Sequence, residues 1–432
     1  MKLPVKLLLF CLILILSLNI LYSQPKWQRV ASPTTKWLYK CSFTDSLNGW
    51  AAGDSGIIIH TSNAGADWVI QQTGIDYFIE DIFFLNTRLG WAISNDFLSY
   101  GPMILKTTNG GNNWNVTRYP DSNLVLITVN FLDSLNGYFG GSSGTILKTT
   151  NAGFNWIKCS LESSFFSYFP IRKFSFSNSQ YGLACGGIID INGLIWRTTD
   201  YGYNWAIMDT TLEPINDIMF YNDQIVLAAG GDYEYGGAFY KSTDGGINWA
   251  DSIIGIFGSG HCIAPRSLQE MWISLGFSQL WMVSIDGGYS WLSYNTPDSS
   301  AIYDAVFIDS LRGWAFGTYG GIFKYNPEGE IGIKNIKIPE SANLFQNYPN
   351  PFNPKTTIGY RILKSSKVKI ILFDVLGREV KVLVDDYKLP GYYELEVISD
   401  ELSSGVYFYK LVVDSDGEAG DYFATKKMVI TK

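Results

Sequence analysis

The sequence predicts an all-β protein in which a seven-bladed β-propeller is followed by a small immunoglobulin-like β-sandwich. An eight-residue phrase ending in Trp recurs six times between residues 61 and 291, with successive Trp residues 42 to 49 positions apart. A period of this length, with about four short strands in each repeat, is typical of propeller blades. Beyond residue 342 the repeat gives way to alternating strands separated by Gly and Pro turns, as expected of a sandwich.

The chain begins with the pattern of an export signal. Lys2 and Lys6 precede an apolar run over residues 7–18, and Ser23 is a small residue suited to cleavage. The run is short for a membrane span, although a retained anchor is the alternative. We therefore expect residues 1–23 to be a signal peptide, and the mature chain to carry no transmembrane segment.

The recurring phrase predicts a hairpin turn, and its cleanest copy is residues 242–249, STDGGINW. Ser, Thr, Asn or Asp side chains can bond backbone N–H groups one or two residues on, and Gly supplies a positive φ. The Trp is large enough to fill the gap between neighbouring sheets. The phrase resembles the Asp-box (BNR) hairpin, and we expect it to staple each blade rather than bind a ligand. Its third-position residues are Asn63, Asn109, Asn151, Asp200, Asp244 and Asp286, and its tryptophans are Trp68, Trp114, Trp156, Trp205, Trp249 and Trp291.

Seven modules are expected, with first strands beginning near residues 38, 79, 126, 171, 215, 260 and 302. The seventh lacks the box Trp, and Pro327 disfavours a fourth strand there. Residues 26–31 include Trp27 and resemble the missing strand. We predict that they pair with the third strand of the seventh module and close a propeller spanning residues 24–327, because closure removes exposed sheet edges. A disordered mature N-terminus is the alternative.

The C-terminal part contains a predicted linker, residues 328–342, and a predicted sandwich, residues 343–432. The sandwich opens with NYPNPFNP (residues 347–354), whose prolines forbid helix. Strands are expected over residues 356–362, 368–373, 379–384, 392–398, 406–413 and 423–430.

This region resembles the type IX secretion C-terminal sorting domain (type A), through NYPNPFNP, FDVLGREV (373–380), LSSGVYFY (402–409) and KKMVI (426–430). The resemblance implies that residues 343–432 are handled by the type IX secretion machinery. It also implies a secreted protein, or one attached to the outer cell surface. An ordinary immunoglobulin-like adhesion module is the alternative.

Composition excludes several classes of function. The net charge of −8 argues against nucleic acid as a partner. His60 and His261 are the only histidines, so a His-rich metal site is not expected, and we expect neither metal nor cofactor. The cysteines of the mature chain favour buried free thiols, with a disulfide between Cys159 and Cys185 as the pairing to test; the four are Cys41, Cys159, Cys185 and Cys262.

The modules look most like photosystem II assembly factor-like propellers, a group that offers no catalytic residues to carry over. We therefore expect a non-enzymatic module that binds a glycan or a protein. Its candidate surface is the propeller face opposite the boxes, where loops combine aromatic rings with acids; packing of those loops is the alternative role for the rings. The candidate residues are Phe97, Tyr100, Phe166, Tyr168, Asp232, Tyr233, Glu234 and Tyr235.

The competing function is a secreted glycoside hydrolase of the sialidase or xyloglucanase kind. Such enzymes need an arginine cluster or a close pair of carboxylates on the loop face. The propeller arginines occupy unlike module positions, and the Phe-Arg-Ile-Pro signature of sialidases is absent. The sequence alone does not locate a pair of carboxylates across a cleft of the ring.

Overall fold

The computed structural model describes residues 26–96, 101–329, 343–347, 349–362, 366–375, 377–388, 391–399, 402–414 and 422–431. The chain divides into two compact units, Met1–Lys334 and Asn335–Lys432. The predicted signal peptide and nearly all of the predicted linker lie outside the described residues, so both stay predictions. No helix within the described ranges has the length and apolar character needed to cross a membrane.

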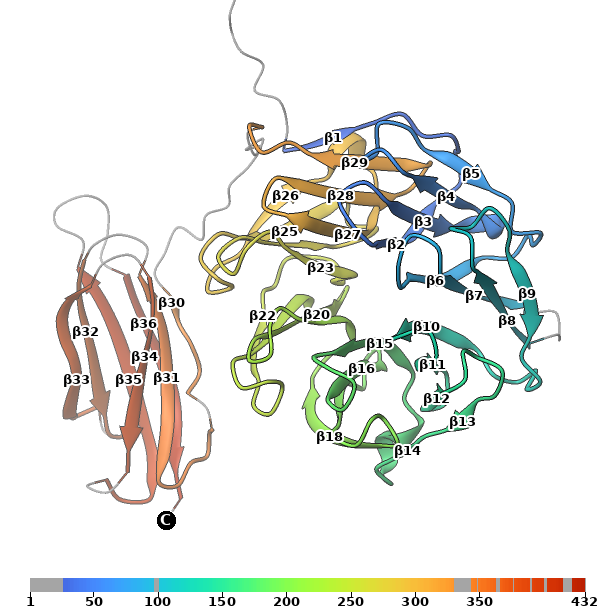
Figure 1. The fold of residues 1–432 in the computed structure, drawn as a ribbon. Helices are drawn as coiled ribbons and strands as arrows, with labels where there is room; N and C mark the ends of the chain where they lie inside the picture. Colours follow the sequence, from blue (N-terminus) through green and yellow to red (C-terminus); the bar gives the residue numbers. More distant parts are fainter. Residues whose placement is uncertain are drawn as a thin grey trace, which may run out of the picture. The chain divides into compact units, whose positions relative to one another are not determined.

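The first unit is a ring of seven sheets, and the strands within each module pair antiparallel (Figure 1). Each sheet follows chain order from its inner strand outward, apart from one outer strand added to the fourth blade and one added to the seventh, and the inner strands of successive sheets contact each other around the ring. The first four blades are β2 (Leu38–Phe43) to β5 (Val69–Gln71) through β3 (Gly49–Gly53) and β4 (Ile58–Thr61); β6 (Ile79–Phe84), β7 (Gly90–Asp96), β8 (Gly101–Thr107) and β9 (Asn115–Arg118); β10 (Leu126–Phe131), β11 (Gly137–Gly141), β12 (Thr145–Thr149) and β13 (Ile157–Lys158); and β15 (Ile171–Phe176), β16 (Gly182–Ile188), β17 (Asn192–Thr198) and β18 (Asn204–Thr211).

The remaining three blades complete the ring. They are β19 (Ile215–Phe220), β20 (Val226–Asp232), β21 (Gly236–Ser242) and β22 (Ala250–Ile253); β23 (Cys262–Pro265), β24 (Met271–Ser274), β25 (Leu280–Ser284) and β26 (Leu292–Asn295); and β27 (Ile302–Asp309), β28 (Arg312–Gly317) and β29 (Gly321–Tyr325).

The N-terminal strand supplies the fourth strand of the seventh blade. β1 (Trp27–Arg29) pairs antiparallel with β29, with Trp27 opposite Tyr325, and Figure 1 shows the two strands side by side. Trp27 is only 2% exposed, and its ring lies 5.2 Å from that of Trp281 in the sixth blade. Trp27 therefore takes the place of the missing box Trp, and β1 covers the outer edge of β29 and completes the four-stranded blade.

The fourth blade departs from the four-strand module. After β13 the chain forms β14 (Ser160–Leu161), which pairs in parallel with β18, Ser160 lying opposite Asn204. This extra outer strand ties the end of the third module to the fourth blade, which thereby becomes a five-stranded sheet.

The six Asp-box turns share one hydrogen-bond pattern. Thr61 Oγ1 accepts from the N–H of Gly65 at 2.9 Å, and Asn63 Oδ1 accepts from the N–H of Asp67 at 3.0 Å. Both bonds span four residues, and the predicted bond two residues on is also present, because Thr61 Oγ1 accepts from the N–H of Asn63 at 3.4 Å. Gly65 has φ 70°, and a Cβ there would lie 2.1 Å from Trp314 of the preceding blade, so the turn requires glycine. The equivalent pairs of bonds recur in the other five turns.

The hydrogen bonds between turns show which turns share a face of the propeller, and they define two faces. On one face each Asp-box turn bonds the hairpin turn between the first two strands of its own blade, as in Ala64 N–H to Leu47 O at 3.0 Å. On the other face the loops joining second and third strands bond those joining successive blades, as in Ser142 N–H to Val125 O at 2.9 Å. We call these the box face and the loop face.

The second unit is a β-sandwich of two sheets. The strand orders are β30–β31–β34 and β33–β32–β35–β36. Its core includes Ile358, Leu372 and Tyr409, and the Tyr409 hydroxyl donates to Phe345 O at 2.8 Å and so fixes the start of the Pro-rich segment. The strands are β30 (Asn343–Leu344), β31 (Lys355–Ile362), β32 (Ser366–Phe373), β33 (Glu379–Lys388), β34 (Gly391–Ile398), β35 (Gly405–Asp414) and β36 (Tyr422–Ile430).

The four described cysteines are unpaired thiols. Cys159, Cys185 and Cys262 are buried, and Cys41 is half-buried on β2. Burial raises the pKa of the Cys159 thiol to about 12, so this thiol is protonated and unreactive at neutral pH.

Candidate functional site

A continuous group of aromatic rings lies on the loop face, and we call it the aromatic rim. Tyr39 on β2 connects its two halves, because its ring centroid lies 4.8 Å from that of Tyr303 on β27 and 4.7 Å from that of Phe78. The rim draws on the sixth, seventh, first and second blades. Its members are Trp37, Tyr39, Phe78, Phe277, Tyr303 and Tyr319.

The exposed rings of the aromatic rim belong to the loops between the second and third strands of their blades. Phe277 is 62% exposed and Tyr319 is 68% exposed, whereas Tyr303 beneath them is buried. Trp37 lies within 6.2 Å of all three rings. Large apolar side chains held at the surface by buried rings of the same kind form a preorganised contact surface.

Two of the residues predicted from the sequence lie beside the rim. Tyr233 and Tyr235 belong to the loop between β20 and β21. The backbone N–H of Phe277 donates to the Tyr233 hydroxyl, while burial raises the pKa of this tyrosine. The Tyr233 ring also lies 5.6 Å from that of Phe257, which is 61% exposed. Tyr233 therefore continues the aromatic surface into the fifth blade, and Tyr235 is 54% exposed on the same loop.

The other predicted aromatic residues do not join this surface in the described part of the chain. Phe166 and Tyr168 belong to a short 3-10 turn, Phe165–Tyr168, before the fourth blade. The ring contacts of that turn are with its own neighbours, including Phe166 with Phe169 at 5.4 Å. Phe97 and Tyr100 lie outside the described residues.

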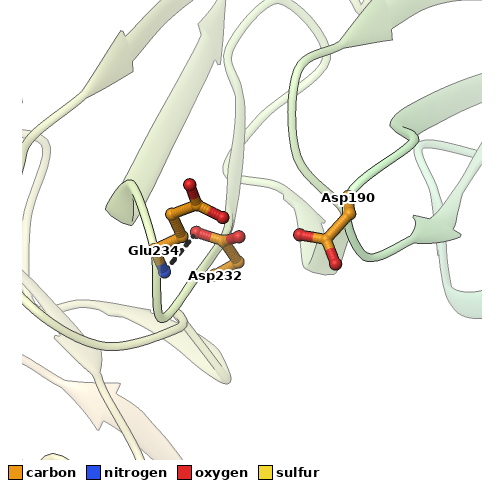
Figure 2. Close-up of side chains that lie close together, drawn as sticks. All are labelled: Asp190, Asp232 and Glu234. Atoms are coloured by element: carbon orange, nitrogen blue, oxygen red, sulfur yellow. Dashed lines mark hydrogen bonds between the residues drawn. The ribbon is translucent and has the colours of Figure 1, made fainter.

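Carboxylates from two neighbouring blades converge next to Tyr233 and Tyr235. Asp190 in the loop between β16 and β17 faces Asp232, the last residue of β20, and Glu234 in the loop that follows it (Figure 2). One carboxylate oxygen from each lies within 4.8 Å of the others. Asp232 is buried, and its Oδ1 accepts from the N–H of Glu234 at 2.9 Å and of Tyr235 at 2.7 Å. The sequence pointed to Asp232 and Glu234, but it did not point to Asp190.

A fourth carboxylate, Glu213, lies close enough to these three for their charges to affect it. It belongs to the loop between β18 and β19 and is only 3% exposed, and its Oε2 has no hydrogen-bond partner among the described residues. Burial raises the pKa of Glu213, and the charges of Asp232, Asp190 and Glu234 raise it further, while a backbone hydrogen bond from Asp190 opposes the shift. We call these four residues the acid cluster.

Titratable groups also line the inner strands. Burial raises the pKa of Glu80 to about 7, while a hydrogen bond from Asn95 opposes the shift. Burial lowers the pKa of His261 to about 4, and the charges of Lys40 and Arg172 add to this effect. His261 is therefore neutral at physiological pH.

The propeller arginines do not converge on a common point within the described residues. Four of them each pair with a different acid, and a sialidase-like cluster would require three of them to meet. The pairs are Arg29 with Asp298, Arg118 with Asp96, Arg266 with Glu270, and Arg312 with Asp309.

The box face carries a hollow that the sequence did not indicate. It has a volume of about 500 Å³ and lies between the second and third blades. Lys106 and Phe154 line it together with the box residues Asn109, Trp114 and Trp156. Residues expected to be purely structural therefore also reach a solvent-filled space.

The fold and its turns define an Asp-box propeller joined to a C-terminal sandwich, and family comparisons agree with both parts. Residues 20–123 and 66–218 match the family model of the photosynthesis system II assembly factor YCF48. Residues 346–431 match the secretion system C-terminal sorting domain. That match indicates export by type IX secretion to the exterior or the cell surface. No curated protein matches the sequence.

Solved structures show the same propeller fold. YCF48 bound to D1 peptide is 21% identical, with a TM-score of 0.56 over 70% of this chain and 99% of that chain. YCF48 from Cyanidioschyzon merolae is 22% identical, with a TM-score of 0.56 over 70% of this chain and all of that chain. The Niastella koreensis GH74 enzyme is 13% identical, with a TM-score of 0.55 over 93% of this chain and 68% of that chain. The neighbours therefore include an enzyme as well as assembly factors, and at these identities they show the fold alone.

Proposed function

We propose that this protein is a secreted or cell-surface binding module without enzymatic activity, and that the loop face of its propeller holds a glycan or protein ligand. The aromatic rim carries this proposal. It packs two exposed rings, Phe277 and Tyr319, against the partly buried ring of Trp37 on the face where the loops of successive blades differ.

Flat rings beside carboxylates match the chemistry of both ligand classes. The apolar face of a sugar ring stacks on an aromatic side chain, and its hydroxyls donate to carboxylates. A peptide uses the same surface through apolar side chains and backbone N–H groups. The similarity to YCF48 bound to D1 peptide favours a peptide, because there a propeller of the same fold is bound to one.

The proposal assigns separate roles to the parts of the chain. The propeller, residues 24–327, is the exported domain that binds the ligand, and residues 328–342 connect it to the sandwich. The sandwich, residues 343–432, interacts with the type IX secretion machinery, in agreement with the family match over residues 346–431. Residues 1–23 direct the chain to the inner membrane.

A glycoside hydrolase is the second candidate, because the acid cluster provides close carboxylates on the loop face and a GH74 enzyme shares the fold. Retaining glycosidases hold their two carboxyl groups about 5–5.5 Å apart, and inverting ones about 6.5–9.5 Å apart. One oxygen from each of Asp190, Asp232 and Glu234 lies within 4.8 Å of the others, so these carboxylates are near neighbours. The binding proposal therefore rests on the aromatic rim, and an activity assay separates the two candidates.

Arrays of glycans and of peptides test the proposal when they are probed with the full mature chain. We expect the double substitution Phe277→Ala and Tyr319→Ala to weaken binding about tenfold or more, since exposed anchors dominate such contacts. The melting temperature should stay within about 2 °C, because neither side chain is buried.

Phe154→Ala with Tyr289→Ala is the matched control, because it removes two exposed rings from the box face. This variant should bind like the wild type. Loss of binding in the control alone would place the ligand on the box face and overturn the proposal. Release of reducing sugar from polysaccharides by the wild type, abolished by Asp190→Asn, would instead establish the hydrolase.

A further inference from the structure

We propose that the acid cluster is a calcium site that joins the fourth and fifth blades, a role independent of what the aromatic rim binds. Asp190 comes from one blade, and Asp232 and Glu234 come from the next (Figure 2). An ion held between them would bridge two loops that otherwise project separately.

The spacing of the oxygens fits the size of the ion. Calcium binds oxygen ligands at about 2.3–2.6 Å, so two ligands on opposite sides of it lie about 4.6–5.2 Å apart. One oxygen from each of Asp190, Asp232 and Glu234 lies within 4.8 Å of the others. Magnesium usually keeps several waters and is held by one or two carboxylates, so a site with three carboxylates favours calcium.

The buried carboxylate of Glu213 is a second, independent indication of a ligand. An acidic side chain that is 3% exposed and has an unpartnered oxygen is costly to bury. No lysine or arginine within the described ranges forms an ion pair with any of the four acids. A cation at the cluster would supply the missing partner.

The donor atoms select the type of metal. The cluster offers carboxylate oxygens and contains neither cysteine nor histidine, so it suits calcium rather than zinc or copper. Asp232 already has its Oδ1 occupied by two backbone N–H groups, which orients the carboxylate and leaves Oδ2 for an ion. An exported protein meets calcium at concentrations matching the affinities of extracellular modules, about 10⁻⁴–10⁻³ M.

Calcium titration of the chelator-treated mature protein tests the site, with calorimetry for stoichiometry and terbium luminescence as a second readout. Tyr235 lies next to Glu234 and can sensitise terbium bound at the cluster. We expect one ion per chain and a melting temperature that rises with calcium and saturates. Asp190→Asn and Glu234→Gln should each weaken calcium affinity about tenfold or more, since affinity follows the number of charged ligands.

Asp76→Asn is the control, because Asp76 is an exposed acid in another loop of the same face and the substitution changes the net charge equally. It should leave calcium binding unchanged. The proposal is overturned if the wild type binds no calcium at about 10 mM, well above the expected range. It is equally overturned if Asp190→Asn and Glu234→Gln bind like the control. Both variants alter exposed side chains, so a failure to fold does not obscure the result.

Discussion

The two faces of the propeller differ in how closely their turns resemble one another. On the box face six turns repeat the same pair of hydrogen bonds, and their glycines have φ between 70° and 93°. On the loop face the corresponding loops differ in composition, from Ser-Ser-Gly at residues 142–144 to Tyr-Glu-Tyr at residues 233–235. Repetition marks positions fixed by backbone geometry, which every blade must satisfy. Divergence marks positions released from that constraint, where a binding surface can develop.

A substitution that disrupts the closure of the ring is expected to have the largest effect on stability. Trp27→Ala removes a buried side chain whose ring contacts Trp272, Trp281, Phe307 and Tyr325. We expect it to lower the free energy of unfolding by about 3–5 kcal/mol, measured by urea denaturation. Trp249→Ala, at a half-buried box Trp, should cost less. An equal or smaller loss at Trp27 would contradict closure by the N-terminal strand.

A substitution within one Asp-box turn tests the same comparison, with a smaller expected loss of stability. Thr198 Oγ1 accepts from the N–H of Gly202 and donates to Asp200, each at 2.9 Å. Thr198→Ala leaves a buried N–H without its partner, so we expect a loss of about 1–3 kcal/mol. Tyr319→Ala on the loop face should change stability by no more than about 0.5 kcal/mol. If the two losses measured by urea denaturation were equal, the faces would not differ in structural role.

Much of the fold could be predicted because its determinants are local. The six boxes carry their own turn chemistry, and Trp27 signalled the closing strand by resembling the box tryptophans. The strands of the sandwich were predicted to within a few residues because Gly and Pro turns mark their ends. The family matches confirm the recognition of both parts.

The candidate site was harder to predict because blades distant in sequence assemble it. Tyr39 and Tyr303 are 264 positions apart in the chain, yet their rings lie 4.8 Å apart. In the sequence Asp190 and Glu213 look like ordinary loop acids, because only the folded propeller brings them close to Asp232. One signal was available in the sequence: equivalent loops of adjacent blades both carry acids, at Asp190 and at Asp232 with Glu234.

Hydrogen exchange of the mature chain, with and without the strongest array ligand, tests the central claim most directly. We predict slower exchange for loop-face amides on ligand addition, notably at residues 37–39, 233–235, 276–278 and 318–320, with the Asp-box turns unchanged. Slower exchange confined to the box turns, such as residues 107–114 and 149–156, would contradict the account and place the function on the repeated face.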